Sequence, residues 1–270
     1  MIRVAGPLLT ILLGGLVLKA FIGALEPRMV FFPYRGEDET PARLGLRYEH
    51  LSLATSDGER LAAWQLEPER PLADIVYFHG NGGNLSLWLP VYAGIHAQGY
   101  NVLGVDYRGY GASTGSPTED GLYADARAVL AHHAARGAHR RRVVYWGRSL
   151  GGVVAAYAAR HQAPDALILE ATFPDKAAVL RRHLLLRALN VFATYQLPTA
   201  RFLDDVRVPV LVMHGDADTV IPFELGQEVY ERIAGPKQFI RLPGLDHNVI
   251  LGPDDEVYWR PLRAFIAGEA

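Results

Sequence analysis

The chain has 270 residues, a formal net charge of -2, no cysteine, and 50% hydrophobic against 21% charged residues. This length suits one large α/β domain or two small ones, and the hydrophobic content is sufficient for a sizeable core. The small net charge gives no electrostatic case for nucleic-acid binding. The lack of cysteine excludes disulfides, thiolate metal sites and a cysteine nucleophile.

The N-terminal segment is the first predicted element. Residues 4–25 are apolar except for Thr10 and Lys19, and as a helix they would span about 33 Å, close to the hydrocarbon thickness of a bilayer. We therefore expect a single membrane anchor helix over residues 1–27 and a location at a bacterial inner membrane. A cleaved signal peptide is the alternative, because residues 7–18 have the length of its apolar region, and the protein would then be secreted or periplasmic.

Residues 28–47 form a predicted connector. They begin with an apolar and aromatic stretch at 29–34 and continue with a charged stretch at 35–43. The aromatic side chains could lie at a membrane interface or pack against the following domain. We expect that domain to cover residues 48–270.

Strands and helices alternate through the predicted domain. It opens with a β-hairpin over residues 48–66 around a Ser-Asp-Gly turn. Buried strands are expected at 74–78, 101–107, 142–146, 166–169, 210–214 and 238–242, and helices at 84–98, 119–135, 150–161, 224–233 and 256–266. This order implies right-handed βαβ crossovers and a mostly parallel, eight-stranded sheet with helices on both faces. The hairpin would add an antiparallel edge.

One segment, residues 172–208, interrupts this alternation. It has no strand pattern, and residues 180–192 are predicted to be one helix with Leu185, Leu189 and Phe192 on one face and His183, Arg187 and Asn190 on the other. An insertion at the carboxyl edge of a sheet is a natural lid. Its leucines could cover the active site, or they could face acyl chains at a membrane while its arginines face anionic headgroups.

The pattern Gly147-x-Ser149-x-Gly151 follows a predicted strand and precedes a predicted helix. This is the context of a nucleophile elbow, in which a serine stands on a tight turn. Ser149 is therefore the candidate nucleophile, and the backbone N–H of Leu150 is one candidate oxyanion donor. The glycine-rich turn after the strand at 74–78 offers a second, for which we choose the backbone N–H of Asn81, with Gly82 as the alternative.

A serine nucleophile needs a base and an acid that orients the base, which follow it in the order acid then histidine. His247 is the candidate base and Asp218 the candidate acid, because both follow strands on the edge that carries the elbow. Asp216 and Asp246 are rivals for the acid role. Asp216 lies nearer the strand end, and Asp246 adjoins His247 in the sequence.

Several motifs together carry a family resemblance: His79-Gly80-Asn81, Asp106-Tyr107-Arg108-Gly109-Tyr110-Gly111, Gly147-Arg148-Ser149-Leu150-Gly151-Gly152, His214-Gly215-x-x-Asp218-x-x-Ile221-Pro222 and His247-Asn248. They resemble the α/β-hydrolase superfamily, and most of all its small-lid, membrane-anchored serine esterases related to monoacylglycerol lipases and protein depalmitoylases. The resemblance implies a triad of Ser149, Asp218 and His247, and a fixed, non-catalytic loop at residues 106–113. The lid differs, being richer in leucine and arginine.

These features predict a membrane-anchored serine carboxylesterase, lipase-like, that cleaves acyl esters such as monoacylglycerols through an acyl-enzyme. The alternatives are an acyl-protein thioesterase and a catalytically silent, membrane-bound interaction domain. We expect no cofactor and no metal. The expected partners are a small acyl ester or lipid substrate and membrane lipid bound through the N-terminal helix and the lid, with no nucleic acid.

Overall fold

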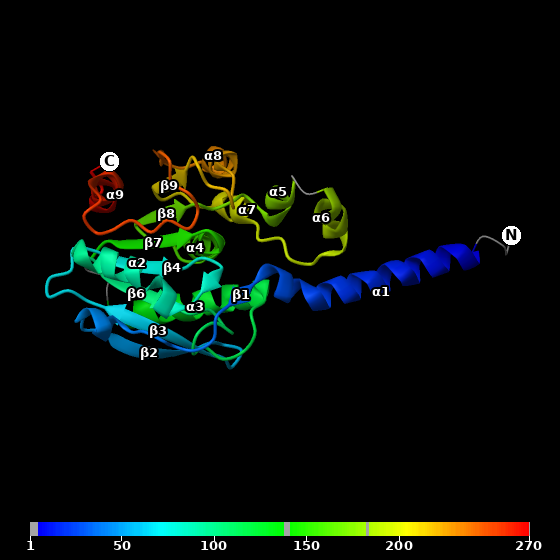
Figure 1. Cartoon of the computed structure of the whole chain (residues 1–270), viewed down its shortest axis with the longest axis horizontal. Coiled ribbons are helices and arrows are strands. Elements are labelled where there is room, and N and C mark those ends of the chain that lie inside the picture. Colours follow the sequence, from blue (N-terminus) through cyan, green and yellow to red (C-terminus); the bar gives the residue numbers. More distant parts are fainter. Residues whose placement is uncertain (1–4, 138–140, 182–183, 270) are drawn as a thin grey trace.

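Eight strands form the central sheet in the order β10-β9-β8-β7-β4-β6-β3-β2 (Figure 1). The computed structural model describes residues 5–137, 141–181 and 184–269. The strands are β2 (Glu49–Ala54), β3 (Arg60–Leu66), β4 (Asp74–Phe78), β6 (Asn101–Val105), β7 (Val143–Arg148), β8 (Ala166–Glu170), β9 (Val210–Gly215) and β10 (Lys237–Leu242). All pairs from β10 to β6 are parallel, whereas β3 is antiparallel to both β6 and β2. The predicted mixed sheet with a hairpin edge is confirmed.

Helices cover both faces of this sheet: α2 (Leu85–Ala97), α3 (Glu119–Ala135), α4 (Leu150–His161), α8 (Phe223–Arg232) and α9 (Glu256–Ala267). Alternate side chains of β4 point to opposite faces, as the pleat requires. Val76 and Phe78 pack in one core with α3, α4 and α8. Ile75 and Tyr77 pack in a second core with α2 and α9. The sheet is therefore buried on both sides, as a mostly parallel sheet must be.

The N-terminal helix α1 (Ala5–Val30) extends away from the sheet in Figure 1. Among the described residues, no helix combines the length and the apolar character needed to cross a membrane. The expected membrane-spanning anchor is therefore not confirmed, and the expected location stays a prediction.

The connector packs against the domain. Its strand β1 (Phe32–Pro33) pairs in parallel with β5 (Gly82–Gly83), and a short 3-10 helix, η1 (Pro41–Leu44), follows. The Asn81 side chain fixes this chain crossing, because its amide donates to the Val30 carbonyl at 2.6 Å and its oxygen accepts from the Phe32 N–H at 3.2 Å. Phe31 is buried against Tyr195. Packing on the domain is thus the correct alternative for Phe31, whereas the side chain of Phe32 is exposed.

The lid lies between β8 and β9. It contains α5 (Lys176–Leu180), α6 (Leu184–Leu189), the 3-10 turn η2 (Asn190–Phe192) and α7 (Thr199–Leu203). The prediction of one helix over residues 180–192 is wrong, because α5 ends at Leu180 and a separate helix begins at Leu184. An ion pair between Arg181 and Glu228 of α8 holds the end of α5 to the domain. His183, placed on the polar face of that predicted helix, lies outside the described residues.

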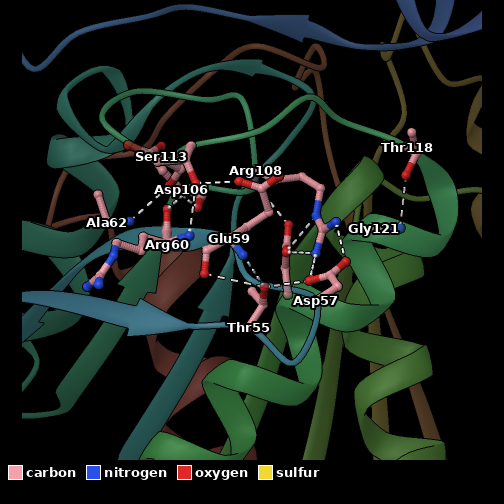
Figure 2. Close-up of polar contacts among 12 residues, drawn as sticks. Thr55, Asp57, Glu59, Arg60, Ala62, Asp106, Arg108, Ser113, Thr118 and Gly121 are labelled. Carbon is pink, nitrogen blue, oxygen red and sulfur yellow. Dashed lines mark hydrogen bonds and ion pairs between the residues drawn. The ribbon is translucent and has the colours of Figure 1, made fainter.

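Arg108 fixes the loop at residues 106–113 between the hairpin turn and α3 (Figure 2). Its guanidinium donates to Asp125 at 2.8 Å and to Asp57 at 2.7 Å and 3.1 Å. On the other side of the loop, the Ser113 hydroxyl donates to the Asp106 carbonyl and accepts from the N–H of Ala62 in β3. Burial raises the pKa of Asp125, against the opposing effect of Arg108. The guanidinium is therefore the counter-charge that keeps this buried carboxyl compatible with the fold.

We expect Arg108→Leu to lower the free energy of unfolding by about 3–5 kcal/mol, because it leaves the buried Asp125 without its partner. Urea unfolding followed by circular dichroism measures this loss. The control is Arg136→Leu, which removes an exposed ion pair with Glu49 and should cost at most about 1 kcal/mol. Equal losses in the two variants would contradict a special role for Arg108.

Candidate active site

Ser149 stands on a strained turn between β7 and α4. Its φ of 54° and ψ of -118° lie outside the regions that residues with a side chain normally adopt. The turn fits because the positions two residues before and after Ser149 are glycine: a Cβ on Gly151 would lie 1.9 Å from the Phe78 carbonyl oxygen, and one on Gly147 would lie 2.1 Å from the Gly151 oxygen. The Ser149 N–H donates to the Glu170 carbonyl at 2.8 Å. β8 thus helps to hold the serine in this conformation.

Three predicted site residues lie in one hydrogen-bonded line. His247 Nε2 is 3.1 Å from the Ser149 Oγ, and His247 Nδ1 is 2.7 Å from Asp218 Oδ2. These residues come from the turn after β7, the loop after β9 and the loop after β10, which all lie at the carboxyl edge of the sheet. A histidine held in this way can accept the serine proton at Nε2 while the carboxylate orients its Nδ1–H.

Asp218 is held as a buried carboxylate. It accepts from the backbone N–H groups of Val220 and Ile221 at 2.9 Å and 2.7 Å. His214 Nε2 lies 3.3 Å from its Oδ2 and 2.8 Å from the Ile221 carbonyl. Burial acts to raise the pKa of Asp218, but the hydrogen bonds from His214, His247 and Ile221 outweigh it and hold the pKa well below the usual range. Asp218 is therefore charged at neutral pH.

The two rival acids have other partners. Asp216 accepts from Arg241 Nε at 2.7 Å and from the Gly244 N–H at 2.6 Å. Asp246 accepts from the N–H and the hydroxyl of Thr219, and from the backbone N–H of His247 rather than from its ring. Both rivals therefore brace loops beside the site, and the geometry favours Asp218 as the acid.

The candidate oxyanion donors lie on two sides of Ser149. Leu150 is the first residue of α4, so its N–H has no partner within the helix. The turn that carries Asn81 passes close to the serine, since a Cβ on Gly80 would lie 3.6 Å from the Ser149 Cβ. His79 braces this turn: its Nδ1 is 2.6 Å from the Gly80 oxygen, and its own carbonyl accepts from the Tyr107 hydroxyl. The donor roles of Asn81 and Leu150 stay predictions.

Arg148 is a site residue that the sequence reasoning missed. Its Nη2 donates to the carbonyls of His247 and Val249 at 2.6 Å and 2.8 Å, so it clamps the histidine loop to the elbow. Its guanidinium also lies over the ring of Trp88, with 5.6 Å between the guanidinium carbon and the ring centroid. The sequence signal that could have indicated Arg148 was its charge, since the other residues of the motif at 147–152 are small or apolar apart from Ser149.

Glu170 fixes the orientation of Arg148. Its carboxylate lies 3.5 Å from Arg148 Nη1 and accepts from Trp146 Nε1 at 3.0 Å and from the Tyr258 hydroxyl at 3.1 Å. Burial acts to lower the pKa of Arg148, but the charge of Glu170 outweighs it and raises that pKa. The buried guanidinium is therefore paired, satisfied and fixed in orientation.

We expect Arg148→Lys to lower kcat on a short ester about 100-fold with little change in KM. A lysine cannot bind both carbonyls and Glu170 in one plane, and a shift of the base by about 1 Å costs about 10²-fold in rate. Steady-state kinetics on a p-nitrophenyl ester measure the effect. The control is Arg160→Lys on α4, whose ion pair with Asp205 is exposed. A wild-type kcat in Arg148→Lys would show that the clamp does not position His247.

Ser149 and His247 open into a cavity of about 920 Å³. Most of its lining is apolar and comes from four parts of the chain: α1, the start of α2, the lid, and the loops after β9 and β10. Within the described residues, no group of three or more histidine, aspartate or glutamate side chains is arranged to hold a metal ion.

Comparisons with known proteins agree with the fold. Residues 69–202 match the family described as "Serine aminopeptidase, S33". The alpha/beta hydrolase domain-containing protein WAV2 of Arabidopsis thaliana is 34% identical, over 94% of this chain and 92% of that protein. An uncharacterized membrane protein of Saccharomyces cerevisiae is 30% identical, over 94% of this chain and 95% of that protein.

Solved structures give the same result. An esterase of Pyrococcus furiosus superposes with a TM-score of 0.67 at 19% identity, covering 88% of this chain and 96% of the esterase. The Rhodococcus esterase RhEst1 gives a TM-score of 0.63 at 16% identity, covering 82% of this chain and 99% of that one. The chain belongs to the α/β-hydrolase superfamily, and this membership supports hydrolase activity.

Proposed function

We propose that the protein is a serine carboxylesterase that cleaves neutral esters with an apolar acyl chain, such as monoacylglycerols. The observation that carries the proposal is the line from Ser149 through His247 to Asp218, open at its serine end to a large apolar cavity. Such a cavity suits a hydrocarbon chain, and the carbonyl carbon of an ester bound there would lie at the serine.

In the proposed acylation step, Ser149 Oγ attacks the ester carbonyl carbon while His247 Nε2 takes its proton. Asp218 holds the Nδ1–H and stabilises the imidazolium. The carbonyl oxygen becomes an oxyanion, which accepts hydrogen bonds from the N–H groups of Asn81 and Leu150. The intermediate then collapses, the bond to the alcohol oxygen breaks, and His247 returns the proton to the leaving alcohol.

In the proposed deacylation step, His247 removes a proton from water as the water oxygen attacks the acyl carbon. The second oxyanion collapses, the bond to Ser149 Oγ breaks, and the serine regains its proton from His247. The products are the carboxylic acid and the alcohol.

The cavity chemistry disfavours an aminopeptidase, despite the description of the matched family. Such an enzyme must hold the ammonium group of its substrate with an available negative charge. Among the described residues that line this cavity, the one carboxylate is Glu26, and it is ion-paired with Lys176. An apolar acyl chain needs no such charge.

An acyl-protein thioesterase would use the same acyl half of the site, and it stays the alternative substrate class. Paired measurements on an oxygen ester and a thioester of the same acyl chain separate the two. We expect a higher kcat/KM for the oxygen ester of glycerol. A higher value for an S-acylated cysteine peptide would favour the thioesterase.

We expect Ser149→Ala to lower the turnover of p-nitrophenyl butyrate by about 10⁴- to 10⁶-fold, because the nucleophile is lost. Circular dichroism serves as the control and should show an unchanged fold and thermal midpoint. More than a tenth of wild-type activity in this variant would mean that another residue is the nucleophile.

We expect Asp218→Asn to lower turnover by about 10⁴-fold, because an amide favours the wrong histidine tautomer. Asp216→Asn is the matched control, since Asp216 follows the same strand but binds Arg241 and Gly244. Its turnover should stay within about tenfold of wild type. The reverse ranking in the same assay would move the acid role to Asp216.

A further inference from the structure

The C-terminal half of α1 presents an apolar stripe to the catalytic cavity. The stripe consists of Leu18, Phe21, Ile22, Leu25 and Met29, which all line that cavity. Relative to Leu18 they lie three, four, seven and eleven residues further along, which brings them to one side of the helix. From the first to the last they cover about 16 Å of the helix axis. A helix outside the α/β domain thus contributes to the surroundings of the catalytic serine.

The lid and the domain supply the opposite walls of the same cavity. Val179, Leu180 and Leu186 come from the lid, and Leu87 and Trp88 come from the start of α2. Ser149 and His247 also line it. The cavity is therefore continuous from the reacting atoms to the stripe of α1.

A buried carboxylate fastens α1 to the lid. Glu26 is only 3% exposed and forms an ion pair with Lys176 at the start of α5. It also accepts from the N–H and hydroxyl of Thr194, both at 2.7 Å, and from the N–H of Tyr195 at 3.1 Å. Burial acts to raise the pKa of Glu26, but Lys176 and Thr194 outweigh it and lower that pKa. Glu26 is thus charged at neutral pH. We call its contacts with Lys176, Thr194 and Tyr195 the latch.

The latch also leaves the cavity electrically neutral along α1. Among its described lining residues the charged side chains are Glu26, Lys176 and Arg148. The first two pair with each other, and Arg148 pairs with Glu170. A charged ligand would find no free counter-charge there and would lose hydration free energy. A hydrocarbon chain is stabilised when it leaves water.

From these observations we propose that the last turns of α1 form one wall of the binding site for the acyl chain of the substrate, with Glu26 latching this wall to the lid. The occupant is the long, linear acyl chain of an ester, with the ester carbonyl carbon at Ser149. This inference rests on the proposed esterase function. It makes α1 a determinant of chain-length preference, since an acetyl group would end before reaching the stripe.

The test compares kcat/KM for p-nitrophenyl acetate and p-nitrophenyl dodecanoate, the latter kept below its aggregation concentration. The full-length variant Phe21→Ser/Leu25→Ser should lose at least about tenfold on the dodecanoate, because a polar wall binds methylene groups poorly. Its activity on the acetate should stay within twofold of wild type. The matched control is Leu16→Ser/Val17→Ser, which changes two exposed residues of the same helix outside the cavity lining. It should leave both values unchanged.

Equal values for the cavity-facing variant, the control and the wild type would overturn the inference. An equal loss on both esters would also overturn it, because α1 would then support the catalytic residues and not the chain. Either result would leave the esterase proposal intact, whereas a wild-type protein that hydrolyses neither ester would contradict the esterase proposal itself.

The latch is tested without catalysis by the binding of an uncharged, fluorescently labelled C12 alcohol to the Ser149→Ala chain. Adding Glu26→Ala should weaken this binding about tenfold or more, because α1 is released from the lid. The same substitution in the active enzyme should leave acetate hydrolysis within twofold of wild type. Unchanged affinity for this alcohol, or a matching loss of acetate hydrolysis, would contradict the latch.

Discussion

The site depends on one strained residue. Ser149 keeps its positive φ only because the two glycines around it let the chain pass within contact distance of β4 and α4, and because β8 holds its N–H. Strain of this kind persists where the surrounding structure over-determines it. This conformation places the serine at the N-terminus of α4, where the helix dipole favours negative charge.

The rest of the site follows from where parallel strands end. β4, β7, β9 and β10 bring the Asn81 turn, the elbow, Asp218 and His247 to one edge. Charged side chains help to hold the loops at that edge: Arg148 binds the histidine loop, and Glu170 fixes Arg148. A rigid scaffold therefore carries the loops in which the chemistry takes place.

Much of the fold and of the candidate site could be predicted because it depends on short stretches of sequence. Strands and helices follow from apolar periodicity, and Ser149, Asp218 and His247 could be chosen because each follows a predicted strand. The proposed role of α1 as a wall of the acyl-chain site could not be predicted. Apolarity alone does not distinguish a side chain that faces lipid from one that faces a cavity. The partners of Glu26, at Lys176 and Thr194, are distant in sequence. The partner of Arg181 at the end of α5, Glu228, is likewise remote in sequence.

The central claim is that Ser149 is a nucleophile activated by its surroundings. The most direct measurement is reaction of the wild-type protein with a fluorophosphonate, followed by peptide mapping by mass spectrometry. The account predicts one phosphonylated site, on Ser149, formed at a rate that falls sharply when His247 is replaced by alanine. Modification of another residue, or equal reactivity without His247, would contradict it.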